Sequence, residues 1–415
     1  MQDAPPPIDP ALTPPPIKGT AALAHRAYAT DGLPELLAFL SRPAATEAEA
    51  AALAYDSALA HQLRFRPKQA RALQAQALDR ARLFRVSERF VPPGARPLRL
   101  LALMAPGDLM VNTPLDFITA HLDVRLDLMF VVPGKPLPER MPDHDVAYFA
   151  VSESDPATLA RLAPLFAAWP RPVLNDPTRV ARLTRDGVAA GLSGVPGVLT
   201  PRIVAVSRDE LAGRVRAGAP ISRLLPGCDF PVLLRPVGSH AGQDLEFLDG
   251  RDSLALYLAE TATERFFLAN FIDYRGADGL FRKYRVVFIA GQPFLCHMAA
   301  SEHWMVHYLN AGMSENDDRR ALEAEAFAEF DTGFAVRHRA ALAAIDAWVG
   351  LEYHQIDCAE MPDGRLLLFE ADTAAIIHTM DPPDLFPYKP PRMLRVMRAF
   401  GDMLRQRAAA SQAAA

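Results

Sequence analysis

The sequence predicts an α/β protein with a helical region at the N-terminus, a small parallel α/β layer and a larger region of antiparallel hairpins. Three observations lead to this fold class. Apolar residues recur every three or four positions between residues 20 and 89, short apolar strands alternate with helical stretches between residues 98 and 175, and hairpin-like strand pairs follow from residue 231. At 415 residues, the chain is long enough for two or three such domains.

Composition limits the classes of function. Hydrophobic residues make up 50% of the chain and the formal net charge is −5, so it should be globular, with no electrostatic argument for nucleic-acid binding. Cys228, Cys296 and Cys358 lie far apart, which is typical of a reducing compartment and gives no zinc or disulfide pattern. Neither a signal peptide nor a membrane-spanning run is evident. We expect a soluble cytoplasmic protein that binds neither nucleic acid nor membrane.

The N-terminal residues divide into two parts. Residues 1–18 contain seven prolines and few apolar side chains, which predicts a disordered or extended arm. Residues 19–91 carry helical stripes, such as Ala70, Ala77 and Phe84, which predict three or four packed helices. These helices would pack on the main body or on a partner. A homodimer and a partner protein both stay open.

Residues 95–178 have the alternating pattern of a small, mostly parallel sheet. Ligands of such sheets bind beyond the carboxyl ends of the strands. The loops at 106–108 and 112–114 follow the first strand, so they either lie near a site or serve only as turns. Asp176 then predicts the start of a helix that runs through Arg185.

The most informative stretch, residues 351–378, has the pattern of a β-hairpin with a turn at 362–364. Because side chains alternate along a strand, Glu370 and Asp372 point to the same face, and the turn can bring Asp357 alongside them. Three converging carboxylates repel unless a cation lies between them, and oxygen ligands suit Mg²⁺ bound with substrate phosphates. The alternative is a surface hairpin that ends in solvated acids.

Two earlier stretches carry cations on strands. A buried strand ends at Arg235, and the loop after it contains Gly238 and Gly242, whose backbone N–H groups can bind phosphate. Ordinary hairpins contain such glycines too. Lys283 and Arg285 share one face of a later strand, and two neighbouring cations repel unless an anion lies between them. We therefore favour a phosphate-binding role for this pair over a solvated strand edge.

Residues 297–313 contain a dense cluster of polar-tipped side chains, with His297, His303 and His307 among them. On a helix, the spacing of His303 and His307 would allow a transition-metal site. No third ligand with suitable geometry is evident, so we do not favour a metal there.

Taken in order, these motifs resemble the ATP-grasp superfamily, which includes glutathione synthetase, D-alanine–D-alanine ligase and the ligases that modify ribosomal proteins. The resemblance covers about residues 98–397 and leaves out the N-terminal helices. It implies a pre-ATP-grasp α/β domain at 95–178, a two-lobed antiparallel ATP-grasp domain at 179–400 and a tail at 401–415. The histidine segment is similar to one in a subgroup with an N-terminal helical, repeat-like region, where it borders the acceptor pocket.

The resemblance implies ATP and Mg²⁺ as ligands. Asp357, Glu370 and Asp372 would bind Mg²⁺, although the family usually has Asn in the third position. The Asn270 carbonyl and the Ile272 N–H would face adenine, with an acid nearby on the ribose. The implied nucleotide-binding residues come from a basic helix, the glycine loop and a hinge strand: Arg185, Arg235, Gly238, Ser239, His240, Gly242, Asn270, Phe271, Ile272 and Asp273.

The implied activity is that of an ATP- and Mg²⁺-dependent carboxylate–amine ligase, which forms an amide or peptide bond through an acyl phosphate. Its partners would be ATP, a carboxylate substrate and an amine acceptor, each a small molecule or a peptide. Lys283 and Arg285 would hold the transferring phosphoryl group, and His297, His303 or His307 would accept a proton. Gln355 stands where many of these ligases have Arg. A kinase-type phosphotransferase and a catalytically lapsed nucleotide-binding or partner-recruiting module stay open as alternatives.

Overall fold

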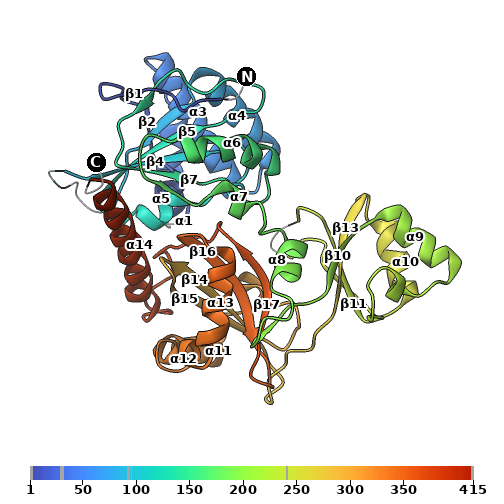
Figure 1. Cartoon of the computed structure of the whole chain (residues 1–415). Helices are drawn as coiled ribbons and strands as arrows, with labels where there is room; N and C mark the ends of the chain where they lie inside the picture. The colour runs from blue at the N-terminus through green and yellow to red at the C-terminus, as the bar shows by residue number, and fades with distance from the viewer. Residues whose placement is uncertain (1–2, 29–31, 91–93, 95, 240–241, 413–415) are drawn as a thin grey trace.

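The computed structural model describes residues 3–28, 32–90, 94, 96–239 and 242–412. Within them, the chain forms a helical region and sheets of six, four, five and two strands (Figure 1). The six-stranded sheet is mostly parallel, and the four- and five-stranded sheets are mostly antiparallel. This arrangement confirms the predicted α/β fold class.

The N-terminal arm is extended. β1 (Ile8–Asp9) pairs with β6 (Met141–Pro142), and β2 (Pro16–Ile17) pairs with β3 (Leu83–Val86). Proline is tolerated at such strand edges, where its missing N–H leaves no ladder bond broken. The alternative of a disordered arm is therefore wrong for residues 3–18.

Four helices follow the arm. They are α1 (Thr20–Tyr28), α2 (Gly32–Leu40), α3 (Glu47–Leu63) and α4 (Pro67–Arg80). The helical stripe was expected to include Phe84, but α4 ends at Arg80 and the buried Phe84 lies in β3. Pairing of β3 with the six-stranded sheet outweighs the helical spacing there.

The parallel sheet has the strand order β2-β3-β5-β4-β7-β8. Its parallel core consists of β5 (Val124–Phe130), β4 (Leu98–Met104), β7 (Val146–Phe149) and β8 (Val173–Leu174), with α5 (Leu115–Thr119) and α6 (Pro156–Ala168) in the connections. These strands are mostly buried, as expected where helices cover both faces of a sheet.

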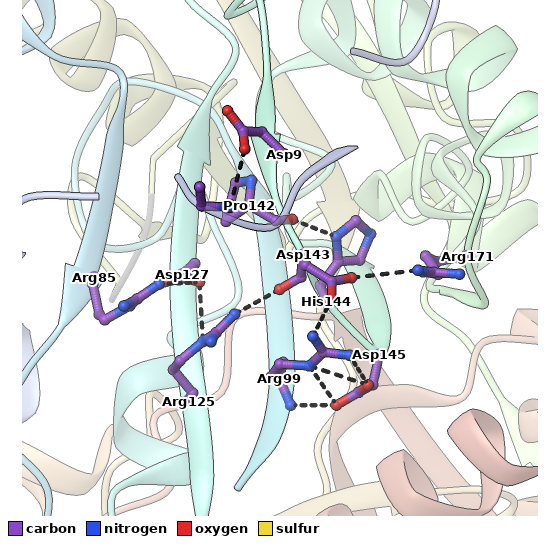
Figure 2. Close-up of polar contacts among 11 residues, drawn as sticks. Asp9, Arg85, Arg99, Arg125, Asp127, Pro142, Asp143, His144, Asp145 and Arg171 are labelled. Atoms are coloured by element: carbon purple, nitrogen blue, oxygen red, sulfur yellow. Dashed lines mark hydrogen bonds and ion pairs between the residues drawn. The ribbon is translucent and has the colours of Figure 1, made fainter. Parts of the chain in front are cut away.

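A network of ion pairs links the amino ends of the parallel strands (Figure 2). The guanidinium of Arg99 bonds to the carboxylate of Asp145, with its Nη2 2.6 Å from Oδ1. Arg85 donates from Nε to the buried Asp127 carboxylate over 2.6 Å, and Arg125 lies on the other side of the same group. This network joins β3, β4 and β5 at the sheet end opposite to the loops that follow the strands, so we assign it a structural role.

The helix predicted from Asp176 through Arg185 is two helices, α7 (Pro177–Val180) and α8 (Arg185–Gly191). Asp176 caps the first and Thr184 caps the second. A four-stranded lobe follows, with β10 (Ile203–Ser207), α9 (Arg208–Ala217), η1 (Ile221–Arg223), β11 (Val232–Pro236), β12 (Glu246–Leu248), α10 (Arg251–Glu260) and β13 (Arg265–Asn270).

The five-stranded sheet has the order β15-β14-β16-β17-β9. Its strands are β9 (Val198–Leu199), β14 (Phe281–Ile289), β15 (Gln292–Ser301), β16 (Tyr353–Glu360) and β17 (Leu366–Asp372). Four short or medium helices belong to this part, namely η2 (Tyr308–Asn310), α11 (Asp317–Glu329), α12 (Phe334–Arg337) and α13 (Arg339–Val349). No helix in the described residues is long and apolar enough to cross a membrane.

The last helix, α14 (Lys389–Gln412), continues through most of the predicted tail. Met403 and Leu404 are buried on it, and the Arg407 guanidinium donates to the carbonyl of Val173 at the parallel sheet. The expected tail at 401–415 is therefore helical as far as Gln412, because its apolar side chains pack against the parallel-sheet domain. The four-stranded lobe stands apart from the rest of the molecule in Figure 1 and has its own apolar core.

Asn175 connects the parallel sheet to the C-terminal hairpin. It is fully buried, and its Nδ2 donates to the Tyr148 hydroxyl over 2.7 Å and to the Tyr353 carbonyl over 2.9 Å. Its backbone φ is 60°, a left-handed conformation that Asn tolerates better than most residues.

We expect Asn175→Ala to lower the free energy of unfolding by about 2–4 kcal/mol, because buried hydrogen bonds are lost and alanine is strained at this φ. Asn175→Gly, which removes the same bonds without the strain, should lose less. Urea unfolding of the three proteins measures both effects. If the alanine variant were as stable as the unchanged protein, the buried hydrogen bonds of Asn175 would not stabilise the fold.

Candidate functional site

Charged side chains converge at one end of the five-stranded sheet. In the β16–β17 hairpin, Asp357 pairs in register with Glu370, and Gln355 pairs with Asp372. β14 flanks β16 on its other side and places Arg285 opposite Asp357. The predicted hairpin is present, with Gly364 in its turn at a φ of 82°. The local strand pattern therefore brings the three predicted carboxylates to one end of the sheet.

Asp357 lies between the two predicted phosphate-binding cations. Its carboxylate, 1% exposed, accepts from Lys283 Nζ over 2.9 Å and from Arg285 Nε and Nη2 over 2.8 and 2.9 Å. Burial would raise the pKa of Asp357, but Arg285 and Lys283 lower it well below its usual range. Burial would likewise lower the pKa of Arg285, but Asp357 raises it above its usual value. Asp357 and Arg285 therefore stay charged inside the protein.

Arg185 and Arg235 reach the same cluster from two further elements. Arg185 is the first residue of α8, and its Nη2 lies 2.5 Å from Oε2 of Glu370. Burial would raise the pKa of Glu370, but Arg185 lowers it below its usual value. Arg235 is the second-last residue of β11 in the four-stranded lobe, and burial together with the Arg185 charge lowers the pKa of Arg235 to about 10. Two like charges from different parts of the fold thus face the same place, which favours an anion there.

The glycine loop after β11 is held by its own arginine. Arg235 donates from Nε to the Ser239 hydroxyl over 3.1 Å and from Nη2 to the Ser239 carbonyl. Gly238 and Gly242 both have positive φ, 83° and 73°. A Cβ on Gly242 would lie 3.1 Å from the sulfur of Met305, so the loop closely approaches the histidine segment. His240 lies outside the described residues.

The predicted adenine-binding residues lie where the lobe joins the rest of the chain. The Asn270 side chain accepts from the backbone N–H of Arg202 over 2.7 Å, and the Phe271 N–H donates to the Pro231 carbonyl over 3.3 Å. The Phe271 ring packs edge-on against Phe247, with ring centroids 4.9 Å apart. These residues are therefore fixed to the four-stranded sheet. Half-buried Ile272 packs with the aromatic cluster of the five-stranded part.

Asp273 and His303 are not joined to the charged cluster by any bond among the described residues. Asp273 forms an ion pair with Arg275, and exposed His303 accepts the Met305 N–H at Nδ1 over 3.2 Å. His303 and His307 lie on a loop, so the helical metal-binding spacing considered for them does not form. Burial and the positive charge of Lys283 lower the pKa of His307, so the charges of the cluster act on this histidine.

Sequence reasoning missed Glu153, which follows β7 at the carboxyl end of the parallel sheet. Its Oε2 is buried and has no hydrogen-bond partner among the described residues. Burial and the negative charge of Asp372 raise the pKa of Glu153 to about 8, and burial and Glu370 raise the pKa of Asp372 to about 6. The signal available in the sequence was the position of an acid just beyond a parallel strand.

The carboxylate end of the cluster offers oxygen atoms, the ligand type that a hard cation such as Mg²⁺ prefers. As the side chains stand, no group of three or more His, Cys, Asp or Glu in the described residues is arranged to hold a metal. The potential ligands are all oxygens, and burial together with the neighbouring carboxylates raises the pKa of both Glu153 and Asp372. The buried Oε1 of Gln355 also lacks a partner within the described chain. The Mg²⁺ ligand set stays a prediction.

The raised pKa of Glu153 predicts how the stability of the ligand-free protein changes with pH. The pKa of Glu153 is about 8 in the folded state against an ordinary value of 4.5, so the folded protein binds this proton more tightly. Its contribution to stability is complete below pH 4.5 and is lost as the pH rises toward 8. We expect Glu153→Gln to melt at a higher temperature than the unchanged protein above about pH 8, with a smaller fall in melting temperature between pH 5 and pH 8. If the melting temperatures of the two proteins changed with pH in the same way, the raised pKa of Glu153 would be wrong.

The fold and the cluster define a mixed α/β protein in which a four-stranded lobe and a five-stranded sheet contribute cations and carboxylates to one place. No family model matches the sequence, and no curated protein matches it. Among solved structures, the chain is similar to a RimK domain protein ATP-grasp from Sphaerobacter thermophilus, at 16% identity, 74% coverage of this chain, 99% of that chain and a TM-score of 0.41.

Two further solved structures are similar in the same way. One is the D-alanine-D-alanine ligase from Coxiella burnetii, at 12% identity, 76% coverage of this chain, 98% of that chain and a TM-score of 0.45. The other is a D-alanine–D-alanine ligase from Bacillus anthracis complexed with ATP, at 13% identity, 75% coverage of this chain, 98% of that chain and a TM-score of 0.40.

Proposed function

We propose that the chain is an ATP- and Mg²⁺-dependent ligase of the ATP-grasp type, which joins a carboxylate to an amine through an acyl phosphate. The observation that carries the proposal is the convergence of four cations and a carboxylate-bearing hairpin from separate parts of the fold. The cations are Arg185, Arg235, Lys283 and Arg285, and they occupy the positions at which the ordered motifs of the sequence resemble that superfamily.

The cations would bind the triphosphate and the transferring phosphoryl group. Arg235 and Arg185 would contact the outer phosphate oxygens, one from each side. The Asp357 carboxylate holds Lys283 and Arg285 in place, so little reorganisation is needed when charge develops on the γ-phosphate. A substrate carboxylate oxygen would bond to the γ-phosphorus while the bond to the ADP oxygen breaks.

The second step would join the amine to the activated carbonyl. The amine nitrogen would bond to the acyl carbon, and inorganic phosphate would leave with its bonding electron pair. His307 is a candidate acceptor for the amine proton, because its lowered pKa keeps the imidazole neutral. Asp357, Glu370 and Asp372 would hold Mg²⁺, which when bound neutralises phosphate charge.

The hinge would bind the base of ATP. The Asn270 carbonyl and the Ile272 N–H would face adenine beside Phe271, and Asp273 would bind the ribose. The Arg275 ion pair of Asp273 would then have to open. The three cysteines form no disulfide, which agrees with a cytoplasmic location.

An assay of ADP release tests the proposal. The full-length protein, ATP and Mg²⁺ would be screened against amino acids and short peptides, with hydroxylamine added to trap an acyl phosphate as a hydroxamate. We expect ADP release that requires a carboxylate, and hydroxamate formation from the same substrate. A stable phosphorylated product would instead indicate a kinase-type enzyme. ATP binding without ADP release across the screen would indicate a binding module.

A further inference from the structure

His297 lies in one row with the charged side chains of the candidate site. Across the five-stranded sheet, Glu370 pairs in register with Asp357, and Asp357 pairs with Arg285. The partner of Arg285 on the next strand, β15, is His297. Directly paired residues of antiparallel strands place their side chains on the same face of the sheet. His297 is therefore the next side chain beyond Arg285, on the side away from the predicted metal ligands.

A β-bulge turns His297 toward this face. The register of β14 with β15 shifts between Arg285 and Val286, and Cys296 is the extra residue on β15. Since side chains alternate along a regular strand, His297 would otherwise share the face of Leu295, which belongs to the apolar core. Bulges of this kind re-aim a side chain and are frequent next to active sites.

The His297 ring has unused hydrogen-bonding capacity. Neither of its nitrogens has a hydrogen-bond partner in the part of the chain that the structure describes, and Nδ1 is the buried one of the two. Burial and the positive charge of Arg285 lower the pKa of His297 well below its usual value, so the imidazole is neutral. A neutral imidazole carries one N–H donor. With the proton on Nε2, the accessible edge of the ring offers that donor to a ligand.

Neighbouring side chains hold the His297 ring in place. It packs against the Tyr308 ring, with the centroids 4.8 Å apart. The Tyr308 hydroxyl donates to Glu323 over 3.0 Å and accepts from Lys389, and both of these charged residues are buried. The other carboxylate oxygen of Glu323 accepts the N–H of Met298 over 3.2 Å, directly beside His297 in the chain. The ring is thus preorganised, which favours a role in a transition state.

We propose that His297 donates a hydrogen bond from Nε2 to the acyl oxygen of the activated substrate. In the proposed function, Glu370 and Asp357 would hold Mg²⁺, and Arg285 would hold the transferring phosphoryl group. Neighbouring strands are about 5 Å apart, so the next position in the row is where the group bonded to that phosphoryl would lie. This inference rests on the proposed ligase function and adds a catalytic residue to its amine step.

The donor acts while the amide bond forms. The amine nitrogen bonds to the acyl carbon, and an electron pair of the carbonyl bond moves onto the oxygen that His297 contacts. The hydrogen bond strengthens as negative charge grows on this oxygen. The pair then returns as the bond to phosphate breaks. Phosphate leaves with the electrons of that bond, and the amine proton passes to a separate acceptor.

Two variants of His297 separate a donor from other roles. His297→Leu removes both nitrogens, whereas His297→Gln keeps an N–H donor and cannot accept a proton as a base. Amide formation would be measured with the carboxylate and the amine that support ADP release in the screen above. We expect His297→Leu to lower kcat by about 10²–10³-fold with the KM of ATP unchanged, and His297→Gln to stay within about tenfold of the unchanged protein. Gln292→Leu, an exposed change on the same strand, is the control and should leave the rate unchanged.

Three results would overturn the assignment. Full activity of His297→Leu would show that no donor is needed there. An equal loss in both variants would indicate a proton acceptor, or a structural role if their melting temperatures fall as well. A rise in the KM of ATP alone would indicate a contact with the nucleotide phosphates.

A failure of the ligase function would be seen separately. If no compound supports ADP release, the imidazole signals of the protein with ADP and Mg²⁺ would be recorded by NMR before and after addition of acetonylphosphonate, a stable analogue of acetyl phosphate. The His297 signal is identified by its absence from His297→Gln. A shift of this signal would support the contact, and an unmoved signal would overturn it.

Discussion

Replacing Arg285 with glutamine is expected to lower the rate of ATP-dependent product formation by at least about 10³-fold, the usual size of the effect of an arginine that stabilises a transferring phosphoryl group. Arg285 is buried beside Asp357, and two of its nitrogens bond to that carboxylate. The variant loses a positive charge where negative charge develops in the transition state. Steady-state ADP release at saturating ATP measures the loss.

The effect on folding must be separated from the effect on catalysis. Removing Arg285 leaves the buried Asp357 with Lys283 alone, which we expect to cost about 3 kcal/mol of unfolding free energy. Arg285→Lys keeps the charge but not the two-nitrogen contact, so it should fold well and still lose most of the activity. Arg395→Gln, which removes a surface ion pair with Asp331, is the matched control and should be unchanged. Full activity of Arg285→Lys and Arg285→Gln would contradict the phosphoryl-binding role.

Replacing Glu370 with glutamine should raise the Mg²⁺ concentration needed for half-maximal activity by about 10–100-fold, as is common when a group at a metal site is changed. Glu370 is a predicted Mg²⁺ ligand, and its carboxylate also pairs with Arg185. The variant keeps the shape of the side chain and loses its charge. Activity measured across a Mg²⁺ titration gives the shift.

Glu360→Gln is the matched control for this change. Glu360 lies on the same hairpin but pairs with Arg337 near the surface, so its variant should need no more Mg²⁺ than the unchanged protein. If Glu370→Gln kept full ATP turnover at ordinary Mg²⁺, the metal assignment at the hairpin would be wrong.

The elements that could be predicted from the sequence are those set by local rules. The hairpin at Asp357 follows from strand alternation and a glycine turn, and the Lys283–Arg285 pair follows from alternation alone. Contacts between distant segments escaped prediction. Phe84 was expected in a helix because its spacing fits one, and only the pairing of β3 with β5 shows that it belongs to a strand.

In the candidate site, too, local patterns could be predicted and contacts between distant segments could not. The order of the motifs pointed to Arg185 and Arg235, although each reaches the cluster from a different element. Glu153 was missed because the effect of Asp372 on its pKa depends on how the parallel-sheet domain packs against the hairpin, which no local pattern reveals. The Asp357 ion pairs with both cations were equally hidden, since the sequence places these residues more than 70 positions apart.

One continuous apolar core runs through the N-terminal helices, the parallel sheet and the five-stranded sheet, while the four-stranded lobe keeps a separate core of its own. The two cores share no residue, so we expect them to unfold as separate units in the empty protein. A nucleotide clamped between them would couple their unfolding. Calorimetry should then record two heat-absorption peaks for the empty protein and a single, later peak once the nucleotide is bound.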